Sequence, residues 1–165
     1  MSNFGFESGR TIKQTGTNAK ISEYHCAVGL AQLDRIDAIK NKRHNILNSY
    51  NTLFKNYNLK IKTQEGLDSF VPASLYVLFN QGDTGTLFEQ LLSQGIETRR
   101  LYWPLIRGFP AFKGNTLTAS LNFKHAQVVS SQGLALPFHG LLKSTDIERT
   151  VSTLSKLICK QVLTK

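Results

Sequence analysis

The chain has 165 residues, 41% of them hydrophobic and ten of them phenylalanine, which is enough for one folded domain and argues against disorder. Its 20 Lys and Arg against 11 Asp and Glu give a formal net charge of +9, which suits an anionic partner. The basic residues are dispersed and do not alternate with aromatic ones as in a nucleic-acid-binding platform. A small anionic molecule therefore fits the charge better than nucleic acid. A basic nucleic-acid-binding domain, with steeply salt-dependent affinity, is the alternative.

The amino-terminal part predicts an irregular arm and a polar loop. Residues 1–17 mix Gly, Ser, Thr and Asn, which favours an irregular arm or a short edge strand. The loop that follows carries an amide at Asn18 and a cation at Lys20, directly before a good helix N-cap at Ser22. Amides, cations and helix amino termini are the groups that bind phosphate. The alternative is that Asn18 only shapes the turn and Lys20 is solvated.

A long helix is predicted after Ser22. Apolar residues recur at steps of three and four through Leu33, and the pattern continues, with a kink, to about Phe54. A helix of this length suits an element that joins two domains. The basic cluster on it is expected on a solvated face and consists of Lys40, Lys42, Arg43 and His44.

The rest of the chain predicts an α+β unit, with a small, largely antiparallel sheet flanked by helices. Alternating and apolar stretches predict strands, and three- and four-residue periodicity predicts helices. In chain order, we expect strands at 59–63 and 74–79, a turn and cap at 81–85, a helix that ends at Gly95, a strand at 96–102, an irregular loop at 104–114, a helix at 123–131, an extended piece at 133–136 and a final helix capped by Ser144. The predicted domains are 1–57, the loop and long helix, and 58–165, the α/β unit.

A second candidate site lies in the predicted strand 96–102 and the Trp that follows it. Arg99 and Arg100 should point to opposite faces of the strand, so that one can hold an anion. Tyr102 and Trp103 precede a proline and could line the mouth of a substrate site. The alternative is core and rim packing with one surface arginine.

The cysteines and histidines show no metal-ligand spacing. Cys26 and Cys159 are far apart and are expected to be buried free thiols in a reducing compartment. Packed or hydrogen-bonded side chains are expected for the histidines, which are His25, His44, His125 and His139. The amino terminus lacks signal-peptide features and no apolar run is long enough to span a membrane, so we expect a soluble, cytoplasmic protein.

Several of these stretches, in order, resemble the DegT/DnrJ/StrS family of pyridoxal-phosphate-dependent nucleotide-sugar aminotransferases. They are Asn3-Phe4-Gly5-Phe6, Gly16-Thr17-Asn18-Ala19-Lys20-Ile21-Ser22-Glu23, Ala27-Val28-Gly29-Leu30, Gly95-Ile96-Glu97-Thr98-Arg99-Arg100-Leu101-Tyr102-Trp103-Pro104-Leu105, Pro110-Ala111-Phe112, Leu136-Pro137-Phe138-His139 and Asp146-Ile147-Glu148-Arg149.

The resemblance implies the aspartate-aminotransferase fold (fold type I) and a pyridoxal phosphate cofactor. In the family, the loop amide reaches across a dimer interface to the cofactor phosphate of the neighbouring subunit. That role falls on Asn18, and the basic position on Lys20. The implied substrate is a nucleotide-linked 4-keto-6-deoxy sugar used in polysaccharide or O-antigen synthesis, with Arg99, Tyr102 and Trp103 as substrate contacts. Many members carry His two residues after the proline of this segment, where this chain has Ile106.

The resemblance covers only the carboxyl-terminal part of such an enzyme. The family's Schiff-base lysine, and the acid that pairs with the pyridine nitrogen, lie upstream of the loop, so no catalytic residue is expected in this chain. We therefore expect a truncated or split aminotransferase that is inactive alone and associates as a homo-oligomer, with a complete subunit or with a separate large-domain chain. A non-catalytic dimerisation module for a full-length aminotransferase is the alternative.

Overall fold

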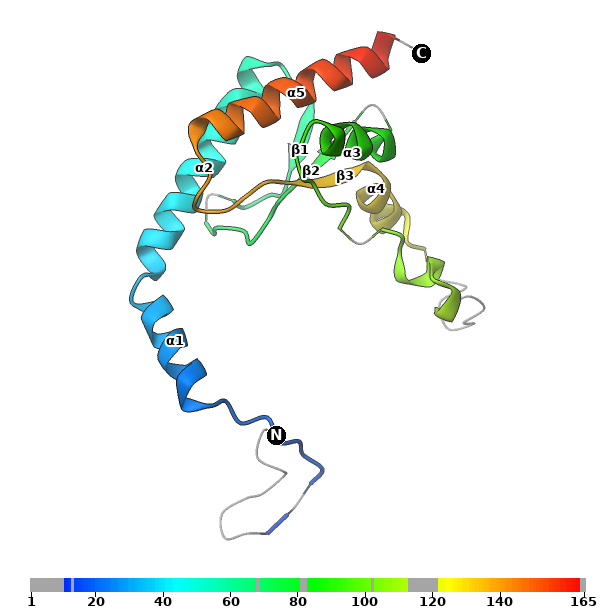
Figure 1. The fold of residues 1–165 in the computed structure, drawn as a ribbon. Helices are drawn as coiled ribbons and strands as arrows, with labels where there is room; N and C mark the ends of the chain where they lie inside the picture. The colour runs from blue at the N-terminus through cyan, green and yellow to red at the C-terminus, as the bar shows by residue number, and fades with distance from the viewer. Residues whose placement is uncertain are drawn as a thin grey trace. The chain divides into compact units, whose positions relative to one another are not determined.

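The computed structural model describes residues 11–12, 14–67, 69–80, 83–101, 103–112 and 122–163. The chain divides into two compact units, Met1–Ile39 and Lys40–Lys165, and each is described by itself (Figure 1). The predicted boundary between 57 and 58 refers to the domains of a complete family member and stays a prediction.

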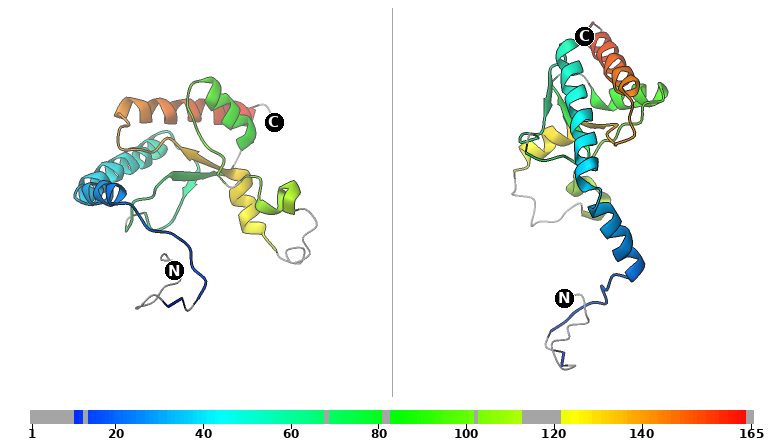
Figure 2. Two further views of the ribbon diagram at one scale, coloured as in Figure 1. Left: turned by 60° about the horizontal axis from the view of Figure 1, so that its bottom comes forward. Right: turned by 90° about the vertical axis from the view of Figure 1, so that its left-hand side faces the viewer.

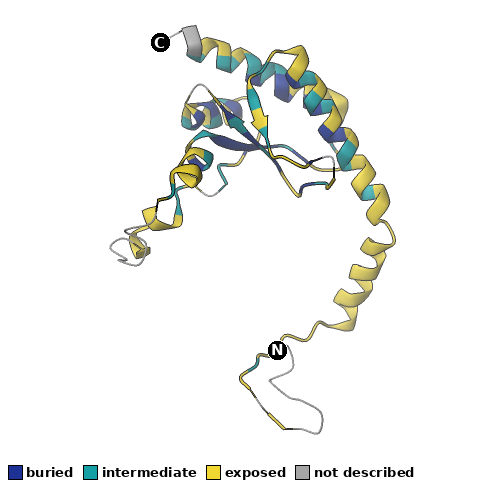
Figure 3. Cartoon of the chain, turned by 180° about the vertical axis from the view of Figure 1, so that it is seen from behind, coloured by how far each residue is buried: buried dark blue, intermediate teal, exposed yellow. Residues whose placement is uncertain are grey.

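The first unit is dominated by a helix without a buried side chain. Helix α1, Glu23–Leu33, starts where predicted, and the Ser22 hydroxyl accepts from the His25 backbone N–H at 3.4 Å. Its apolar residues are solvent-exposed, with exposed fractions of 75% for Tyr24, 63% for Leu30 and 62% for Leu33 (Figure 3). The helix was therefore predicted correctly from the sequence, although among the described residues none buries a side chain of α1.

Helix α2, Ile36–Asn56, begins after a two-residue break, as the predicted kink requires. Its second half enters the core of the second unit, where Tyr50 is fully buried and its hydroxyl donates to the Pro137 carbonyl at 2.8 Å. Burial raises the pKa of the Tyr50 phenol, so that the hydroxyl stays a donor.

Arg43 departs from the solvated face predicted for the basic cluster. Its guanidinium donates to the carbonyls of Pro72 and Ala73 at 3.0 and 2.9 Å, and it lies 5.5 Å from the ring centre of Phe138. These carbonyls belong to the segment just before the second strand. Among the described residues, they have no backbone hydrogen-bond donor from a helix or a strand ladder. Arg43 therefore ties that segment to α2.

A three-stranded antiparallel sheet forms the centre of the second unit. Strands β1, Ile61–Thr63, β2, Leu75–Phe79, and β3, Gly133–Leu136, lie in the order β1-β2-β3, all within predicted extended stretches. Alternate residues of β2 are buried, and Val77 lies opposite Leu134 in the β2–β3 register. This face forms one core with side chains from α2, from α3, Thr84–Ser93, and from α5, Ser144–Leu163. Figure 2 shows the ribbons of these helices around the sheet.

The helices of the second unit lie close to their predicted positions. They are α3, Thr84–Ser93, α4, Lys124–Gln132, and α5, Ser144–Leu163. Gly95 follows α3 with φ of +69°, the left-handed conformation that ends helices at glycine. Ser144 is the first residue of α5 rather than its cap, and the Asp146 carboxylate accepts from the Lys143 backbone N–H at 3.0 Å.

The strand predicted at 96–102 is wrong. Within the described part of this stretch only one bridge forms, in which Arg99 and Ala135 exchange backbone hydrogen bonds of 3.0 and 2.8 Å. Two residues after Ala135, and just past the end of β3, Pro137 has no N–H to continue the ladder. At the other end, the Leu101 carbonyl accepts instead from the Tyr76 hydroxyl at 3.3 Å. The segment is thus extended but carries a single ladder position.

Two further expectations need correction. The loop predicted at 104–114 contains two short 3-10 helices, η1, Ile106–Gly108, and η2, Pro110–Phe112. Both cysteines are exposed rather than buried, since Cys26 lies on the uncovered α1 and Cys159 lies off the buried stripe of α5. Among the described residues, no helix is long and apolar enough to cross a membrane.

Shortening a buried side chain of α5 should lower the free energy of unfolding strongly. Leu154 has no exposed surface, and Leu154→Ala should lower the free energy of unfolding by about 2–5 kcal/mol. Leu141 is 84% exposed, so the same change there should cost less than about 0.5 kcal/mol. Urea denaturation followed by circular dichroism measures both, and equal losses would contradict the placement of the core.

Candidate functional site

The loop before α1 presents Asn18 and Lys20 on the surface of the first unit. Both residues are exposed, and Asn18 takes part in an isolated β-bridge. The loop runs directly to the capped amino terminus of α1, whose first turn carries Glu23. An amide and an ammonium group are a donor set that fits a phosphate, whereas a larger cofactor would need further walls. The structure thus keeps the two predicted phosphate-binding residues together in one exposed loop.

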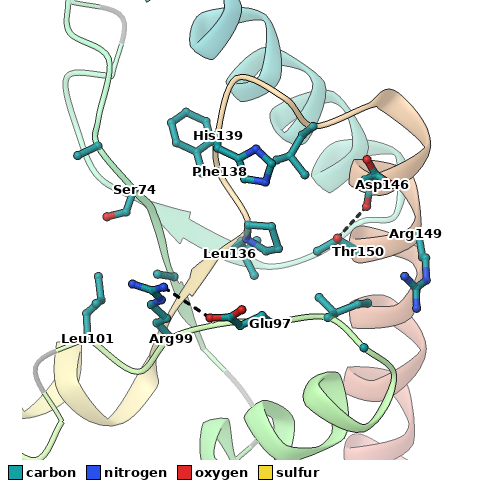
Figure 4. Close-up of a pocket in the computed structure, with 16 residues that line it drawn as sticks. Ser74, Glu97, Arg99, Leu101, Leu136, Phe138, His139, Asp146, Arg149 and Thr150 are labelled. Atoms are coloured by element: carbon teal, nitrogen blue, oxygen red, sulfur yellow. Dashed lines mark hydrogen bonds and ion pairs between the residues drawn. The ribbon is translucent and has the colours of Figure 1, made fainter. Parts of the chain in front are cut away.

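Arg99 lines a cavity of about 640 Å³ in the second unit (Figure 4). The cavity lies where the segment around Glu97 and the segment after β3 diverge beyond their single bridge, and the start of α5 forms its far wall. Arg99 makes an ion pair of 3.5 Å with Glu97, and both side chains are about three-quarters exposed, at 74% and 75%. Solvent screens this pair strongly, so a ligand carboxylate or phosphate can compete with Glu97 for the guanidinium.

The opposite side of the cavity carries Arg149, with Asp146 and Thr150 beside it on α5 (Figure 4). Arg149 donates to the carbonyl of Gln94, just past the end of α3. The Thr150 hydroxyl donates to the Asp146 carbonyl at 2.8 Å. The Arg149 bond ties the start of α5 to the end of α3, and Arg149 also lines the cavity. The cavity therefore offers guanidinium groups from Arg99 and Arg149 beside the carboxylates of Glu97 and Asp146, and suits a polar ligand.

Arg100 does not line this cavity but stacks on Trp103, as expected if the two arginines point to opposite faces. The Arg100 guanidinium lies 3.8 Å from the ring centre of Trp103, which is 51% exposed. Its Nε is buried and makes no hydrogen bond among the described residues. A cation above an indole face is a favourable contact, so Arg100 fixes the plane of the Trp103 ring.

Asp83 connects this stack to the start of α3. Its carboxylate accepts from the Thr86 hydroxyl at 2.7 Å and the Gly85 N–H at 2.9 Å. These hydrogen bonds, the hydroxyl first, and to a smaller extent the Arg100 charge hold the pKa of Asp83 below its usual value.

The predicted site residues thus form two groups, one in each unit. Asn18 and Lys20 belong to the first unit, and Arg99 and Trp103 to the second, while Tyr102 lies outside the described residues. Their roles in binding stay predictions. Arg149 and Tyr76 were not predicted as site residues. Arg149 lies off the apolar stripe of the final helix, but nothing local indicates that it lines the same cavity as Arg99, 50 positions earlier.

Comparison with known proteins gives a consistent result. The model of the DegT/DnrJ/EryC1/StrS aminotransferase family matches residues 1–155. A dTDP-4-amino-4,6-dideoxy-D-glucose transaminase of Shigella dysenteriae is 29% identical over 168 residues, which cover 95% of this chain and 43% of that protein. Protein Rv3402c of Mycobacterium tuberculosis is 26% identical over 155 residues, or 93% of this chain and 37% of that protein. The chain therefore spans well under half the length of the curated relatives it matches.

Solved structures agree on the fold. A PLP-dependent aminotransferase from Bacillus cereus superposes with a TM-score of 0.84 at 23% identity, over 93% of this chain and 42% of that one. DesI, crystallised in the presence of its TDP-sugar product, gives a TM-score of 0.82 at 20% identity, over 99% and 42%. The chain thus has the fold of part of a fold-type-I enzyme, and the α+β architecture expected from the sequence is confirmed.

The capping role of Asp83 makes a pH-dependent prediction. Asp83→Ala should lower the free energy of unfolding by about 1 kcal/mol near neutral pH, because two amide donors and one hydroxyl lose their acceptor. The folded-state pKa lies below the ordinary value of 3.8, so the contribution is complete above that value and is lost as the pH falls through the lowered pKa. The stability difference between wild type and variant should therefore shrink as the pH falls below 3.8.

Urea titrations at a series of pH values measure this difference. Glu89→Ala is the matched control, because it removes an exposed carboxylate of the same helix and should change stability by less than about 0.5 kcal/mol. A difference between wild type and Asp83→Ala that stays constant from neutral to acidic pH would rule out the charged cap.

Proposed function

The chain belongs to the DegT/DnrJ/EryC1/StrS aminotransferase family, and we propose that it acts as the carboxyl-terminal part of a pyridoxal-phosphate-dependent nucleotide-sugar aminotransferase. The observation that carries the proposal is the exposed loop with Asn18 and Lys20 at the start of a helix that has no buried residue. A phosphate-binding pair on an uncovered helix is what a site completed by another polypeptide requires.

The residues of the loop fit the phosphate end of the cofactor. The Asn18 amide would donate to a phosphate oxygen, and the Lys20 ammonium would supply opposite charge close by. When bound, pyridoxal phosphate supplies the electron sink for moving an amino group. By the family resemblance, its ring and reacting carbon are held by a lysine and an acid from a segment that no part of this chain matches. This chain therefore positions the cofactor without performing the proton transfers.

Substrate contacts are proposed for Arg99 and Trp103. Arg99 faces the cavity and Trp103 is half exposed, so a guanidinium and an aromatic plane are both accessible to a ligand. A nucleotide-linked 4-keto-6-deoxy sugar, with its diphosphate and rings, suits these groups and fits the transaminase named among the relatives. Ile106, 70% exposed, occupies the position where many members have His, so that contact is absent and the binding mode differs there.

The partner must cover α1. The apolar side chains Tyr24, Leu30 and Leu33 are each more than 60% exposed and lie on different sides of the helix. A helix that is apolar on all sides is ordinarily buried by other segments. We propose that a second copy, a complete aminotransferase subunit or a separate large-domain chain covers it in the cytoplasm. The same helix supports a second candidate function, a non-catalytic module that associates with a full-length aminotransferase and supplies Asn18 to its site.

The first prediction from this proposal concerns catalysis. The 165-residue chain, mixed with pyridoxal phosphate and reduced with borohydride, should show no single lysine carrying the cofactor and no turnover of an amino donor. Peptide mass mapping is the readout, and a full-length family member, labelled at one lysine, is the positive control. One specifically labelled lysine together with turnover would make this chain an enzyme on its own.

The second concerns the phosphate loop. In mixed dimers with a full-length relative, Asn18→Ala should weaken cofactor retention by about tenfold, the effect of one lost hydrogen bond to a charged group. Asn48→Ala, at an exposed position of α2, is the matched control and should leave retention unchanged. Cofactor absorbance after gel filtration measures both. Equal retention by the Asn18 variant and the wild type would remove the loop from the cofactor site.

A further inference from the structure

The Tyr76 hydroxyl lies where three segments of the second unit meet. Tyr76 is the second residue of β2 and points to the face opposite the buried Leu75 and Val77. Its single hydroxyl proton is shared between two carbonyls, that of Val129 near the end of α4 at 2.9 Å and that of Leu101 at 3.3 Å. One side chain thus joins β2, α4 and the segment that leads to Trp103.

Gly133 leaves the space that this arrangement needs. A Cβ at position 133 would lie 2.1 Å from the Tyr76 hydroxyl and 2.2 Å from the ring carbon that carries it. Such distances are impossible for real atoms, so the ring can occupy its place only over a glycine. In the β2–β3 register Ala135 lies opposite Tyr76, which makes Gly133 its diagonal neighbour. The glycine and the tyrosine therefore form one packed pair that fixes the position of the hydroxyl.

Leu101 is the last described residue before Trp103 of the candidate site. Two residues earlier, the Arg99 backbone is held to Ala135 by the single bridge. Two residues later, Trp103 lies under the Arg100 guanidinium at 3.8 Å. Because the ladder does not continue past the bridge, the Tyr76 hydroxyl is the hydrogen-bonding group that holds the Leu101 carbonyl in the described structure.

We propose that Tyr76 is a positioning residue for Arg99–Leu101 and for Trp103. Its hydroxyl replaces the missing ladder bond, so that Arg99 keeps its direction into the cavity and Trp103 keeps its stack with Arg100. The claim that this segment meets substrate rests on the proposed function, whereas the claim that Tyr76 fixes the segment does not. The two claims can be tested separately.

The test of positioning uses the only tryptophan of the chain, Trp103. Tyr76→Phe removes the hydroxyl and little else. Since Trp103 is 51% exposed, its release from the stack should raise the acrylamide quenching constant by up to about twofold and shift its emission to longer wavelength. Circular dichroism should show unchanged helix and strand content.

Tyr50→Phe is the matched control. It removes another hydroxyl of the same unit that donates to a backbone carbonyl, that of Pro137, from the core on the other face of the sheet. It should lower stability but leave Trp103 quenching unchanged. If Tyr76→Phe leaves quenching as in wild type, or if Tyr50→Phe raises it equally, Tyr76 has no positioning role.

A second variant keeps the proposal testable if Tyr76→Phe does not fold. Gly133→Ala retains the hydroxyl but pushes it from its place, so it should raise Trp103 quenching by the same route. Wild-type quenching in a folded Gly133→Ala chain would overturn the proposal.

The functional readout uses the assembled enzyme with its partner and a nucleotide sugar as substrate. Tyr76→Phe should raise KM for the nucleotide sugar severalfold with kcat nearly unchanged, because ground-state contacts are lost and the reacting groups are not. A fall in kcat alone would refute a positioning role in substrate binding. If the wild-type assembly does not transaminate, the proposed function is wrong. The positioning role of Tyr76 is then still tested by the quenching of Trp103.

Discussion

The second unit depends on how strand β2 divides its two faces. One face carries Leu75, Val77 and Phe79 into the core that α2, α3 and α5 complete. The other face carries Tyr76, whose ring needs the bare backbone of Gly133 and whose hydroxyl reaches two carbonyls outside the sheet. A one-residue slip of this strand would exchange the faces, removing three core side chains and the contact to Leu101 together. The fold and the candidate site therefore share a single register.

Periodicity explains what could be predicted from the sequence. Three- and four-residue spacing located α1, α2, α3 and α5, alternation located β1, and an apolar stretch located β2. In the second unit these signals reflect burial of one face of each element, whereas α1 has no buried residue. The stretch after Gly95 has the composition of a strand, yet whether it joins a ladder depends on its partner. Pro137 cannot donate and Leu101 is already bonded to Tyr76, and neither fact can be read from the stretch itself.

The same reasoning explains the site. Neighbours in sequence, such as Asn18 with Lys20 and Arg99 with Arg100, could be grouped in advance and lie as spacing suggests. Arg149 faces the cavity only because the end of α3 and the start of α5 meet, a tertiary contact between distant segments. Arg43 was misjudged for a related reason, because its partners are carbonyls left unsatisfied 29 and 30 positions away. Charge count alone does not distinguish a solvated cation from one that binds backbone.

The exposed thiols give the chain a built-in means of footprinting. Cys26 lies on α1, which has no buried residue, whereas Cys159 lies near the end of α5 in the other unit. A thiol-reactive reagent reaches both in the free chain. When another polypeptide covers α1, the alkylation rate at Cys26 falls, and Cys159 serves as an internal reference on the same molecule. The ratio of labelling at Cys26 to labelling at Cys159 therefore reports how far α1 is covered by another polypeptide, without any added tag.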